Sequence, residues 1–442
     1  MASAQTQVHL DQTEIPAGKW SFTSLVAFRF CFAYFLLYCL TNQVITGLVP
    51  IPKLEIPEPS TLWPIRQTVI WTASHIFHVT SPLVYQGSGS GDKTFDWVLD
   101  FCLLVLASGV TAVWSLLGRK HQNYLALYKW FRFFIRFALA GQMISYGFDK
   151  AVPLQMSFPS LTRLVDTFGN FSPMGVLWSS IGASPSYEIF IGCAEIFGGL
   201  LLILPRTTLF GALVCLADAI EIFALNMTYD VPVKLLSFHL ILFSLFLLSP
   251  DFPRLIDFFF LNRAVEPAQQ ESISRANRAK RLIFAAQVFV GLWLIGMNAY
   301  GVSQDWYRYG GGVPKPALYG IWDVEQMSID GEVRSPLLTD YDRWRRVVFD
   351  VSGKLAFQRM NGSFVRYSFS TDGNRKSVAV TKGSDKKWKA NFVFERQSPN
   401  QLALTGEMDA HKINMQLRLV DRSKFLLVNR GFHWVQEYPF SR

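Results

Sequence analysis

Ionisable residues interrupt several long apolar runs of this 442-residue chain. The carboxylates Glu195 and Asp218, the imidazole of His239 and the guanidinium of Arg136 each fall near the middle of such a run. A charged side chain at the centre of a bilayer costs about 2.5 to 3.5 kcal/mol on insertion scales, so such residues normally face the protein interior and pair. Groups of these types that meet in a water-poor pocket can hold a ligand or transfer protons.

Small residues share helix faces with the two carboxylates. Gly192 and Gly199 lie at helical spacing from Glu195, and Cys215 lies three residues before Asp218. Small residues let helix backbones approach closely in a membrane, so these faces should point into the bundle. The spacing therefore predicts that polar groups from four consecutive helices meet at one depth.

We predict that Glu195, Asp218 and His239 are catalytic residues that handle protons, and that Arg136 fixes their charge. The predicted ligand-binding residues are three cations and one further carboxylate: Arg29, Arg132, Arg136 and Glu221. A structural ion network that only holds polar helices together is the alternative interpretation of the same residues.

Membrane-spanning helices must position these side chains, because half of the chain is hydrophobic and 15% of it is aromatic. Crossing the hydrocarbon core takes about 20 helical residues. Seven stretches are long and apolar enough: residues 22–49, 95–117, 125–148, 187–205, 208–228, 232–249 and 281–301. The sequence predicts a polytopic helical bundle over residues 22–304.

Lysine and arginine are concentrated in the loops after the second, fourth and sixth predicted spans, for example at Arg119, Arg206 and Arg254. The positive-inside rule then predicts a cytoplasmic tail over residues 1–21 and an extracytoplasmic C-terminal domain. The tail is polar, so we expect no cleavable signal peptide and a first span that remains as an anchor. Asp96 and Asp100 lie near the outer end of the second span and are ambiguous, because side chains there reach the interface cheaply.

Two long outer segments differ in character. Residues 50–94 combine a proline-rich stretch, a predicted amphipathic helix within residues 65–80 and a Gly/Ser loop. Residues 149–186 mix Gly, Pro and Ser with bulky apolar residues, which predicts a re-entrant or lid segment.

The last part of the chain, residues 305–442, alternates short apolar and polar runs between turn residues. About eight such runs predict an antiparallel β-barrel or β-sandwich. This domain contains 22 Lys and Arg against 15 Asp and Glu, a balance that favours anionic headgroups or an acidic ligand, or simply a solvated basic surface. No nucleic-acid motif is present in the sequence.

Several kinds of site are excluded or disfavoured. The five cysteines form no C-x-x-C pair, and His239 is the one histidine deep in a predicted span, which argues against bis-histidine haem. His75 and His78 form a weak metal candidate, and we predict no metal site. Nucleotide-binding glycine motifs are absent from the sequence. No cofactor is certain, and a quinone dissolved in the bilayer is the redox candidate that remains.

Residues 131–263 resemble the DoxX/DoxD-like family of bacterial membrane proteins, a four-helix membrane module with a core at about residues 125–263. The resemblance is carried by "GFDKAVP" at 147–153 and by "GCAEIFGGLLLILPRTTLFGAL" at 192–213. It implies a role associated with an oxidoreductase, because the family name comes from a quinol-oxidising complex, but it implies no settled reaction. The additional spans and the C-terminal domain depart from that pattern.

The C-terminal domain opens with Gly320-x-Trp322, which resembles the first strand of lipocalin-type barrels. The resemblance implies that Arg430, on the expected last strand, covers Trp322. A generic sandwich is the alternative. A barrel mouth would suit an apolar ligand passed from the membrane.

The leading prediction is a membrane module, associated with an oxidoreductase, that binds a quinone-like amphipathic molecule. The expected partners are the lipid bilayer, a quinone or lipidic ligand, and other proteins of a membrane complex. A proton-coupled transporter or ligand-transfer protein is the first alternative. A non-catalytic scaffold of a respiratory or maturation complex is the second.

Overall fold

The computed structural model describes residues 19–51, 56–266, 276–373, 375–383, 385 and 388–441. Most of the predicted N-terminal tail therefore lies outside the described residues. The chain divides into two compact units, the first formed by Met1–Gly147 and Ala194–Ala299 and the second by Phe148–Cys193 and Tyr300–Arg442. Each unit is described by itself below.

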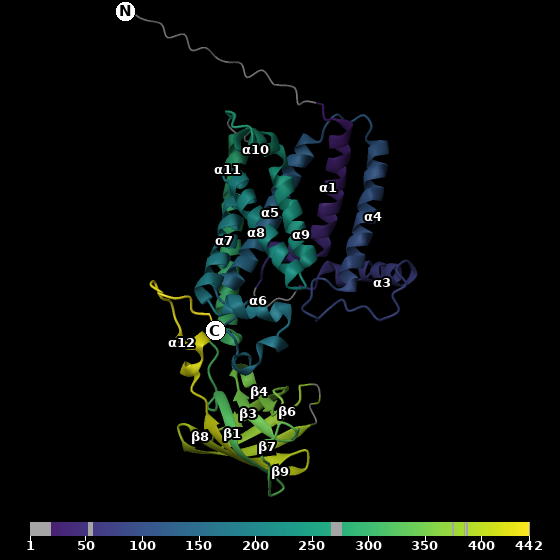
Figure 1. Ribbon diagram of the computed structural model, residues 1–442. Coiled ribbons are helices and arrows are strands. Elements are labelled where there is room, and N and C mark those ends of the chain that lie inside the picture. The colour runs from purple at the N-terminus through teal and green to yellow at the C-terminus, as the bar shows by residue number, and fades with distance from the viewer. Residues whose placement is uncertain are drawn as a thin grey trace, which may run out of the picture. The chain divides into compact units, whose positions relative to one another are not determined.

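The first unit is helical (Figure 1). Its helices are α1 (Phe22–Thr41), α2 (Gln43–Leu48), α3 (Ile65–His75), α4 (Thr94–Leu117), α5 (Leu125–Ala151), α7 (Pro185–Ile203), α8 (Thr208–Thr228), α9 (Lys234–Leu248), α10 (Phe252–Phe259) and α11 (Asn277–Arg308). Three of them, α5, α7 and α11, have one end in the residues of the second unit. Short 3₁₀ turns lie at Pro59–Thr61 and Ser249–Asp251. The helix predicted within residues 65–80 is α3.

Six helical segments of the described chain are long and apolar enough to cross a membrane: α1, α4, α7, α8, α11 and the segment Lys234–Phe259 that joins α9 to α10. The protein is therefore a multi-pass membrane protein. The remaining predicted span, residues 125–148, lies in α5, which is not among these six. Its 27 residues are long enough to cross a bilayer, but Arg132 and Arg136 make it more polar.

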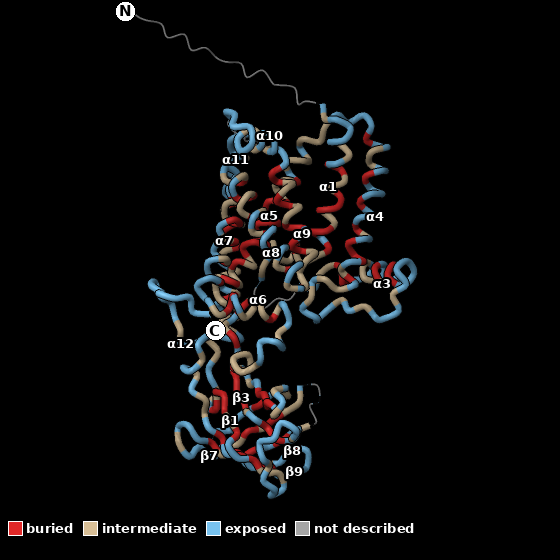
Figure 2. The backbone as a smooth tube through the Cα atoms, viewed as in Figure 1, coloured by how far each residue is buried: buried red, intermediate tan, exposed pale blue. Residues whose placement is uncertain are grey.

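Helix α5 tolerates polar residues because it is packed inside the bundle. Its residues Ile135, Ala138, Leu139 and Ile144 are fully buried. Figure 2 shows the buried residues gathered on the inner sides of the helices. A helix that is covered by other helices needs no apolar surface toward lipid. Its mean hydropathy can therefore be lower than that of the helices around it.

Glycines set the contacts among α5, α7 and α8, as the small-residue spacing predicted. A Cβ atom on Gly199 would lie 2.8 Å from Cγ1 of Ile144, and one on Gly211 would lie 2.8 Å from Cβ of Leu201. A Cβ atom on Gly198 would lie 3.0 Å from Sγ of Cys215. Close backbone approach of this kind maximises van der Waals contact between membrane helices.

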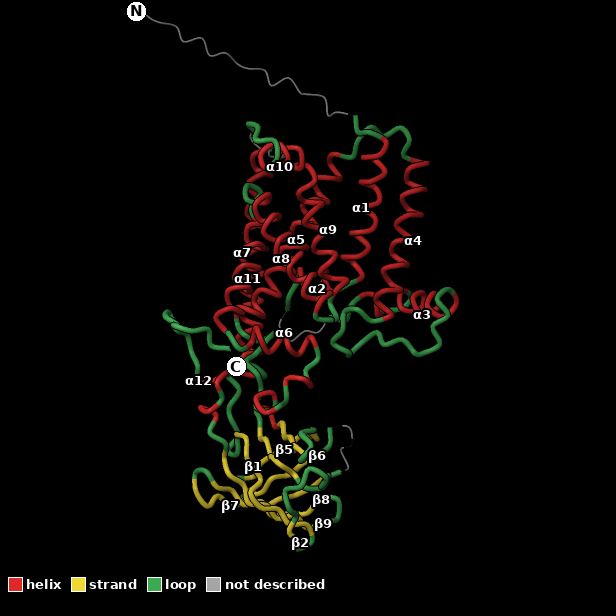
Figure 3. The backbone as a smooth tube through the Cα atoms, in the orientation of Figure 1, coloured by secondary structure: helices red, strands yellow, loops and turns green. Residues whose placement is uncertain are grey.

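The second unit contains α6 (Pro173–Gly182), α12 (Leu426–Asn429) and a sheet, coloured by element type in Figure 3. The strands are β1 (Gly320–Ile329), β2 (Glu332–Val333), β3 (Trp344–Phe349), β4 (Lys354–Arg359), β5 (Phe364–Asp372), β6 (Ser377–Thr381), β7 (Lys389–Ser398), β8 (Gln401–Met408) and β9 (His411–Leu419). Short 3₁₀ turns lie at Arg163–Val165, Phe168–Asn170, Val351–Gly353 and Arg422–Lys424.

Neighbouring strands of this sheet are antiparallel, and β1 also pairs with β9. This second pairing, which aligns Trp322 with Leu419, closes β1 and β3–β9 into an eight-stranded barrel. The prediction of a barrel or a sandwich is therefore resolved in favour of the barrel. The short strand β2 extends the hairpin after β1.

Side chains alternate between the inside and the outside of the barrel. Trp322, Val347 and Phe357 belong to the interior cluster, whereas Ile321 and Val348 belong to a separate cluster. An eight-stranded barrel is just wide enough for side chains to fill it, and its described interior is filled in this way. An apolar ligand in the barrel mouth stays a prediction.

The predicted cover of Trp322 by Arg430 is wrong. Arg430 follows α12, beyond the last strand, and its guanidinium lies over the ring of Phe440. The cation nearest the face of Trp322 is Arg396 of β7, at 5.9 Å from the ring centroid. The Trp322 indole donates instead to the carbonyl of Leu318 at 2.9 Å.

The segment predicted as a lid packs against the outer face of the barrel, within the second unit. Leu161 is buried against Ile321, Val348 and Ala356. The Leu161 N–H donates to Oδ2 of Asp350 at 3.3 Å. These contacts explain why bulky apolar residues alternate with turn residues in this part of the chain.

We expect Gly211→Ala to destabilise the protein by about 1 to 3 kcal/mol, because the new methyl group must push α7 away from α8. Gly109→Ala in α4 is the matched control, since a Cβ atom there meets no atom within 4 Å. It should be neutral or slightly stabilising, because alanine is the better helix former. Thermal unfolding in detergent measures both, and equal melting temperatures for the two variants would contradict the packing.

Candidate functional site

The structure places the two central carboxylates on neighbouring helices. Glu195 of α7 is 4% exposed, and Asp218 of α8 is half-buried. Both carboxylates lie close enough to the thiol of Cys215 to interact with it electrostatically. Glu221, one turn further along α8, is exposed. The predicted proximity of Glu195 and Asp218 thus has a geometric basis in the α7–α8 contact.

His239 lies in a different environment, against α1. Its Nδ1 is 2.7 Å from the carbonyl oxygen of Leu235, and its Nε2 is 2.8 Å from the Tyr34 hydroxyl. The carbonyl can only accept, so Nδ1 carries the proton and Nε2 accepts from Tyr34. The ring also stacks on Tyr38, with centroids 3.5 Å apart. His239 is therefore held as a neutral imidazole between two tyrosines.

The predicted cations contact groups outside this histidine environment. Arg136 donates to Oε1 of Gln287 at 2.9 Å, and Arg132 donates to the carbonyl of Leu247 at 3.0 Å. Arg29 donates to Ser115 at 3.0 Å, near the C-terminal end of α4. Among the described residues, the seven predicted site residues therefore fall into several environments, and their common pocket stays a prediction.

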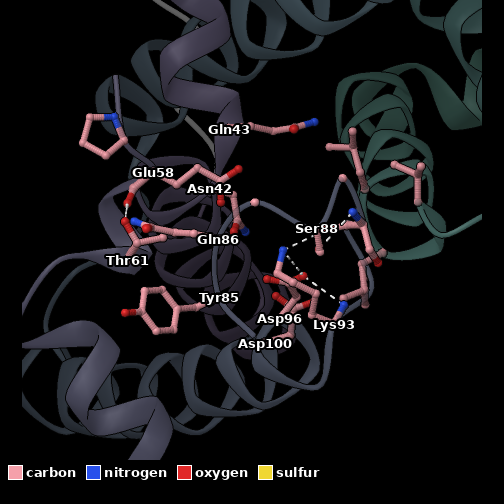
Figure 4. A pocket seen from close by; sticks show the side chains of 18 of the residues that line it. Asn42, Gln43, Glu58, Thr61, Tyr85, Gln86, Ser88, Lys93, Asp96 and Asp100 are labelled. Atoms are coloured by element: carbon pink, nitrogen blue, oxygen red, sulfur yellow. Dashed lines mark hydrogen bonds and ion pairs between the residues drawn. The ribbon is translucent and has the colours of Figure 1, made fainter. Parts of the chain in front are cut away.

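A cavity of about 740 Å³ lies at the end of the first unit where α1 ends and α4 and α9 begin (Figure 4). Its lining combines carboxylates, tyrosines, amides and the Gly/Ser loop: Tyr38, Asn42, Gln43, Ile56, Pro57, Glu58, Thr61, Tyr85, Gln86, Gly87, Ser88, Gly89, Ser90, Gly91, Lys93, Asp96, Asp100, Tyr146, Val233, Leu235 and Leu236. Sequence reasoning did not place a site here.

The Gly/Ser loop is fixed by Asp92, which caps α9. The two carboxylate oxygens of Asp92 accept the N–H groups of Lys234 at 2.7 Å and of Leu235 at 2.9 Å. The N-terminus of a helix leaves such donors unsatisfied and attracts negative charge. Gly91 N–H also donates to the carbonyl of Pro232 at 2.8 Å. The loop wall is thus anchored to the helix that carries His239.

The lysine of the lining is already paired. Lys93 Nζ lies 2.9 Å from Oδ2 of Asp96 and donates to the carbonyl of Ser90 at 2.8 Å. Asp96 also accepts the Lys93 N–H at 3.0 Å, which closes a capping box at the start of α4. Lys93 therefore neutralises Asp96, and it forms no ion pair with Asp100.

Asp100 lies one helical turn beyond Asp96 and is 7% exposed. No hydrogen bond or ion pair from the described part of the chain reaches its carboxylate. Figure 4 shows Asp100 beside Asp96 at the cavity. A buried polar group without a partner is costly, so the cavity contains an acceptor that only water or a ligand can satisfy.

Tyr38 joins the cavity to His239. It lines the cavity, and its ring stacks on the imidazole on the other side. Asp100 interacts electrostatically with both Tyr34 and Tyr38. The cavity is therefore followed inward by a tyrosine, a histidine and a second tyrosine, which are all groups that can exchange protons.

Glu58 supplies a second carboxyl group at the outer rim of the cavity, outside the spanning helices. Burial raises the pKa of Glu58, Asp96 adds to this effect, and Lys93 opposes it. A carboxyl group with a raised pKa exchanges protons nearer to neutral pH than an exposed one does.

We expect Tyr34→Phe to destabilise the protein by about 1 to 3 kcal/mol, because it leaves the buried Nε2 of His239 without a donor. Tyr38→Phe keeps the stacked ring and removes a hydroxyl that no described residue hydrogen-bonds, so its effect on stability should be small. Thermal unfolding of the two variants measures the difference. Equal stability of the two would show that the Tyr34–His239 hydrogen bond does not hold α1 to α9.

No family model matches the chain, and no solved structure matches it. Among curated proteins, the Bacillus subtilis (strain 168) protein YwoB, which is described as uncharacterized, is 33% identical over 116 residues. The match covers 26% of this chain and 73% of YwoB. At this identity and coverage, the chain belongs to the same family as YwoB.

Proposed function

We propose that the first unit binds the headgroup of a quinone-like amphipathic molecule in the Asp100 cavity and exchanges protons with it. The observation that carries the proposal is the buried Asp100 carboxylate, which has no hydrogen-bond partner among the described residues and lines a cavity of about 740 Å³. A quinol hydroxyl is a donor that would satisfy this acceptor. The resemblance to the DoxX/DoxD-like family supports the same class of ligand.

The cavity offers two carboxyl groups for the two protons of a quinol. Oxidation of a quinol breaks two O–H bonds, and releases two protons and two electrons. Asp100 would accept one proton and Glu58 the other. The electrons would pass to a redox protein of the same membrane complex, as the resemblance implies. In this proposal the unit handles binding and protons and leaves electron transfer to its partner.

His239 would pass protons between the cavity and the interior of the bundle. Tyr38 separates it from the cavity, and Tyr34 donates to its Nε2 at 2.8 Å. If the Tyr34 hydroxyl rotates, Nε2 becomes free to accept a proton. Glu195 and Asp218 on the α7–α8 contact remain predicted catalytic residues, and substitution of either would test a second proton-handling pair.

The proposed setting is a bacterial inner membrane, with the N-terminus in the cytoplasm and the C-terminal β domain outside. The basic residues Arg119 and Lys120 lie after the C-terminal end of α4, whereas the cavity lies at its N-terminal end. This orientation puts the cavity at the outer side of the membrane. Labelling of single cysteines introduced at Lys120 and Gly89 in intact cells would test it.

We expect Asp100→Asn to lower the affinity for a quinol by about tenfold or more, because a neutral amide oxygen accepts the quinol O–H more weakly than a carboxylate does. The same variant should raise the melting temperature of the ligand-free protein, because it removes a buried unpaired charge. Quinone that co-purifies with the protein, titration with a short-chain quinol and thermal unfolding measure the two effects.

Asp257→Asn on α10 is the control for the loss of one carboxylate in the same unit, and it should leave quinol binding unchanged. A quinol affinity that is unaltered in Asp100→Asn would contradict the proposal. If liposomes then show a proton flux that depends on Asp100, the transporter alternative holds. If neither property changes and only complex assembly suffers, the scaffold alternative holds.

A further inference from the structure

A second cavity, of about 800 Å³, lies within the second unit. It is enclosed by the segment from Pro153 to Arg163, by the turn that follows α11, and by residues of β3, β4 and β5. Most of these strand residues lie on the outer face of the barrel, whereas Leu355 and Tyr367 belong to the side of the interior cluster. This cavity is therefore separate from the quinone site proposed above.

The lining of this second cavity is strongly basic. Its charged residues are five cations and one carboxylate: Arg163, Lys315, Lys354, Arg366, Arg422 and Asp350. The carboxylate is occupied, because Asp350 Oδ2 accepts the Leu161 N–H at 3.3 Å and Oδ1 accepts the Val351 N–H at 2.8 Å. Asp350 shapes the wall by these bonds, and its single negative charge leaves an excess of four positive charges (five minus one) in the lining.

Three of the cations have no anionic partner among the residues that the structure describes. In the described part of the chain, no carboxylate forms an ion pair with Lys315, Lys354 or Arg366. Arg163 is more constrained, because it lies 3.9 Å from Asp166 and over the ring of Phe171. Like charges gathered in one concavity repel each other, and an anion bound among them would relieve that repulsion.

Arg422 is held in a fixed position at the cavity wall. Its Nη1 donates to the Tyr319 hydroxyl at 3.1 Å. A guanidinium group fixed in this way can present its remaining N–H donors to an oxyanion. Tyr319 keeps the side chain in place, because the guanidinium also lies over its ring at 5.7 Å.

A solvated basic surface would explain the charge but not its arrangement. The cations come from four separate parts of the chain and line one cavity, with Trp306, Tyr309 and Tyr367 beside them. Aromatic rings of this kind can cover an apolar or sugar part attached to an anion. A phosphate group carries several charged oxygens and can therefore contact cations on several walls at once.

We propose that this cavity binds a phosphate group carried on a larger molecule. Two sources share this chemistry, the headgroup of an anionic phospholipid and a soluble phosphate ester. The experiment uses the full-length protein in a nonionic detergent. Its three probes are inorganic phosphate, dihexanoyl phosphatidylglycerol below its micelle concentration, and dihexanoyl phosphatidylcholine as the zwitterionic comparison.

The test variant is Lys354→Gln with Arg366→Gln. Both side chains are exposed and form no ion pair with a described residue, so the barrel should fold. The control is Lys389→Gln with Lys412→Gln, which removes the same charge from strands β7 and β9 outside the cavity. Calorimetric titration gives the affinities, and thermal unfolding verifies that each variant is folded.

We expect inorganic phosphate to bind the native protein and the control alike, and to bind the test variant about tenfold more weakly or worse. Phosphatidylglycerol that binds more tightly than both phosphate and phosphatidylcholine identifies a lipid headgroup. Phosphate that binds while phosphatidylglycerol does not identifies a soluble ester. The proposal is overturned if neither anion binds the native protein, or if test and control variants lose the same affinity.

Discussion

The central constraint on the first unit is the desolvation of a buried carboxylate, that of Asp100, which forms no hydrogen bond or ion pair with a described residue. Asp100 is 7% exposed and lies one turn inside a helix that spans the membrane. An isolated charge in that position would be expelled or neutralised unless a polar cavity reached it. The Gly/Ser loop, the proline-rich turn and the ends of three helices together form that cavity. The desolvation penalty of the Asp100 carboxylate therefore arises at the cavity, where a bound ligand can offset it by donating a hydrogen bond.

Other ionisable groups of the bundle are handled in different ways. His239 is neutral and shares its two nitrogens between Tyr34 and Leu235. Arg136 spreads its donors over the amide of Gln287 and other neutral oxygens, and Arg132 reaches a helix-end carbonyl. These hydrogen bonds hold helices together, although the Nε atoms of Arg132 and Arg136 have no hydrogen-bond partner among the described residues. Asp100 differs from these groups because its carboxylate forms no hydrogen bond at all with a described residue and lines a cavity, which makes this cavity the candidate site.

The fold class could be predicted because it depends on local patterns. Long apolar runs give spanning helices, and alternation between turns gives strands. Closure of the barrel could not be predicted, because it depends on pairing between β1 and β9, which are far apart in the chain. The burial of α5 inside the bundle could not be predicted from its hydropathy, because its arginines lower that value. Arg396 covers Trp322 from a middle strand, where the Gly-x-Trp resemblance indicated Arg430.

The candidate site was harder to predict because its parts come from distant segments. The bond between Tyr34 and His239 joins residues 205 positions apart, and Asp92 caps a helix 142 positions away. The sequence-based prediction chose residues near the middle of each apolar run, which favoured Glu195, Asp218 and His239. Asp100 lies near a helix end, where a charged side chain ordinarily costs little free energy because it can reach the interface. Its burial at a cavity that is also lined by the Gly/Ser loop is a tertiary effect. The i, i+4 spacing of Asp96 and Asp100 beside a long Gly/Ser loop was the one local signal.

Infrared difference spectroscopy of the purified protein, recorded as a bound quinol is oxidised, tests the central claim most directly. The account predicts that a carboxylic acid carbonyl band grows as Asp100 takes up a proton, and that this band is missing in Asp100→Asn. An identical difference spectrum in the native protein and in that variant would show that the buried carboxylate takes no part in the chemistry of the cavity.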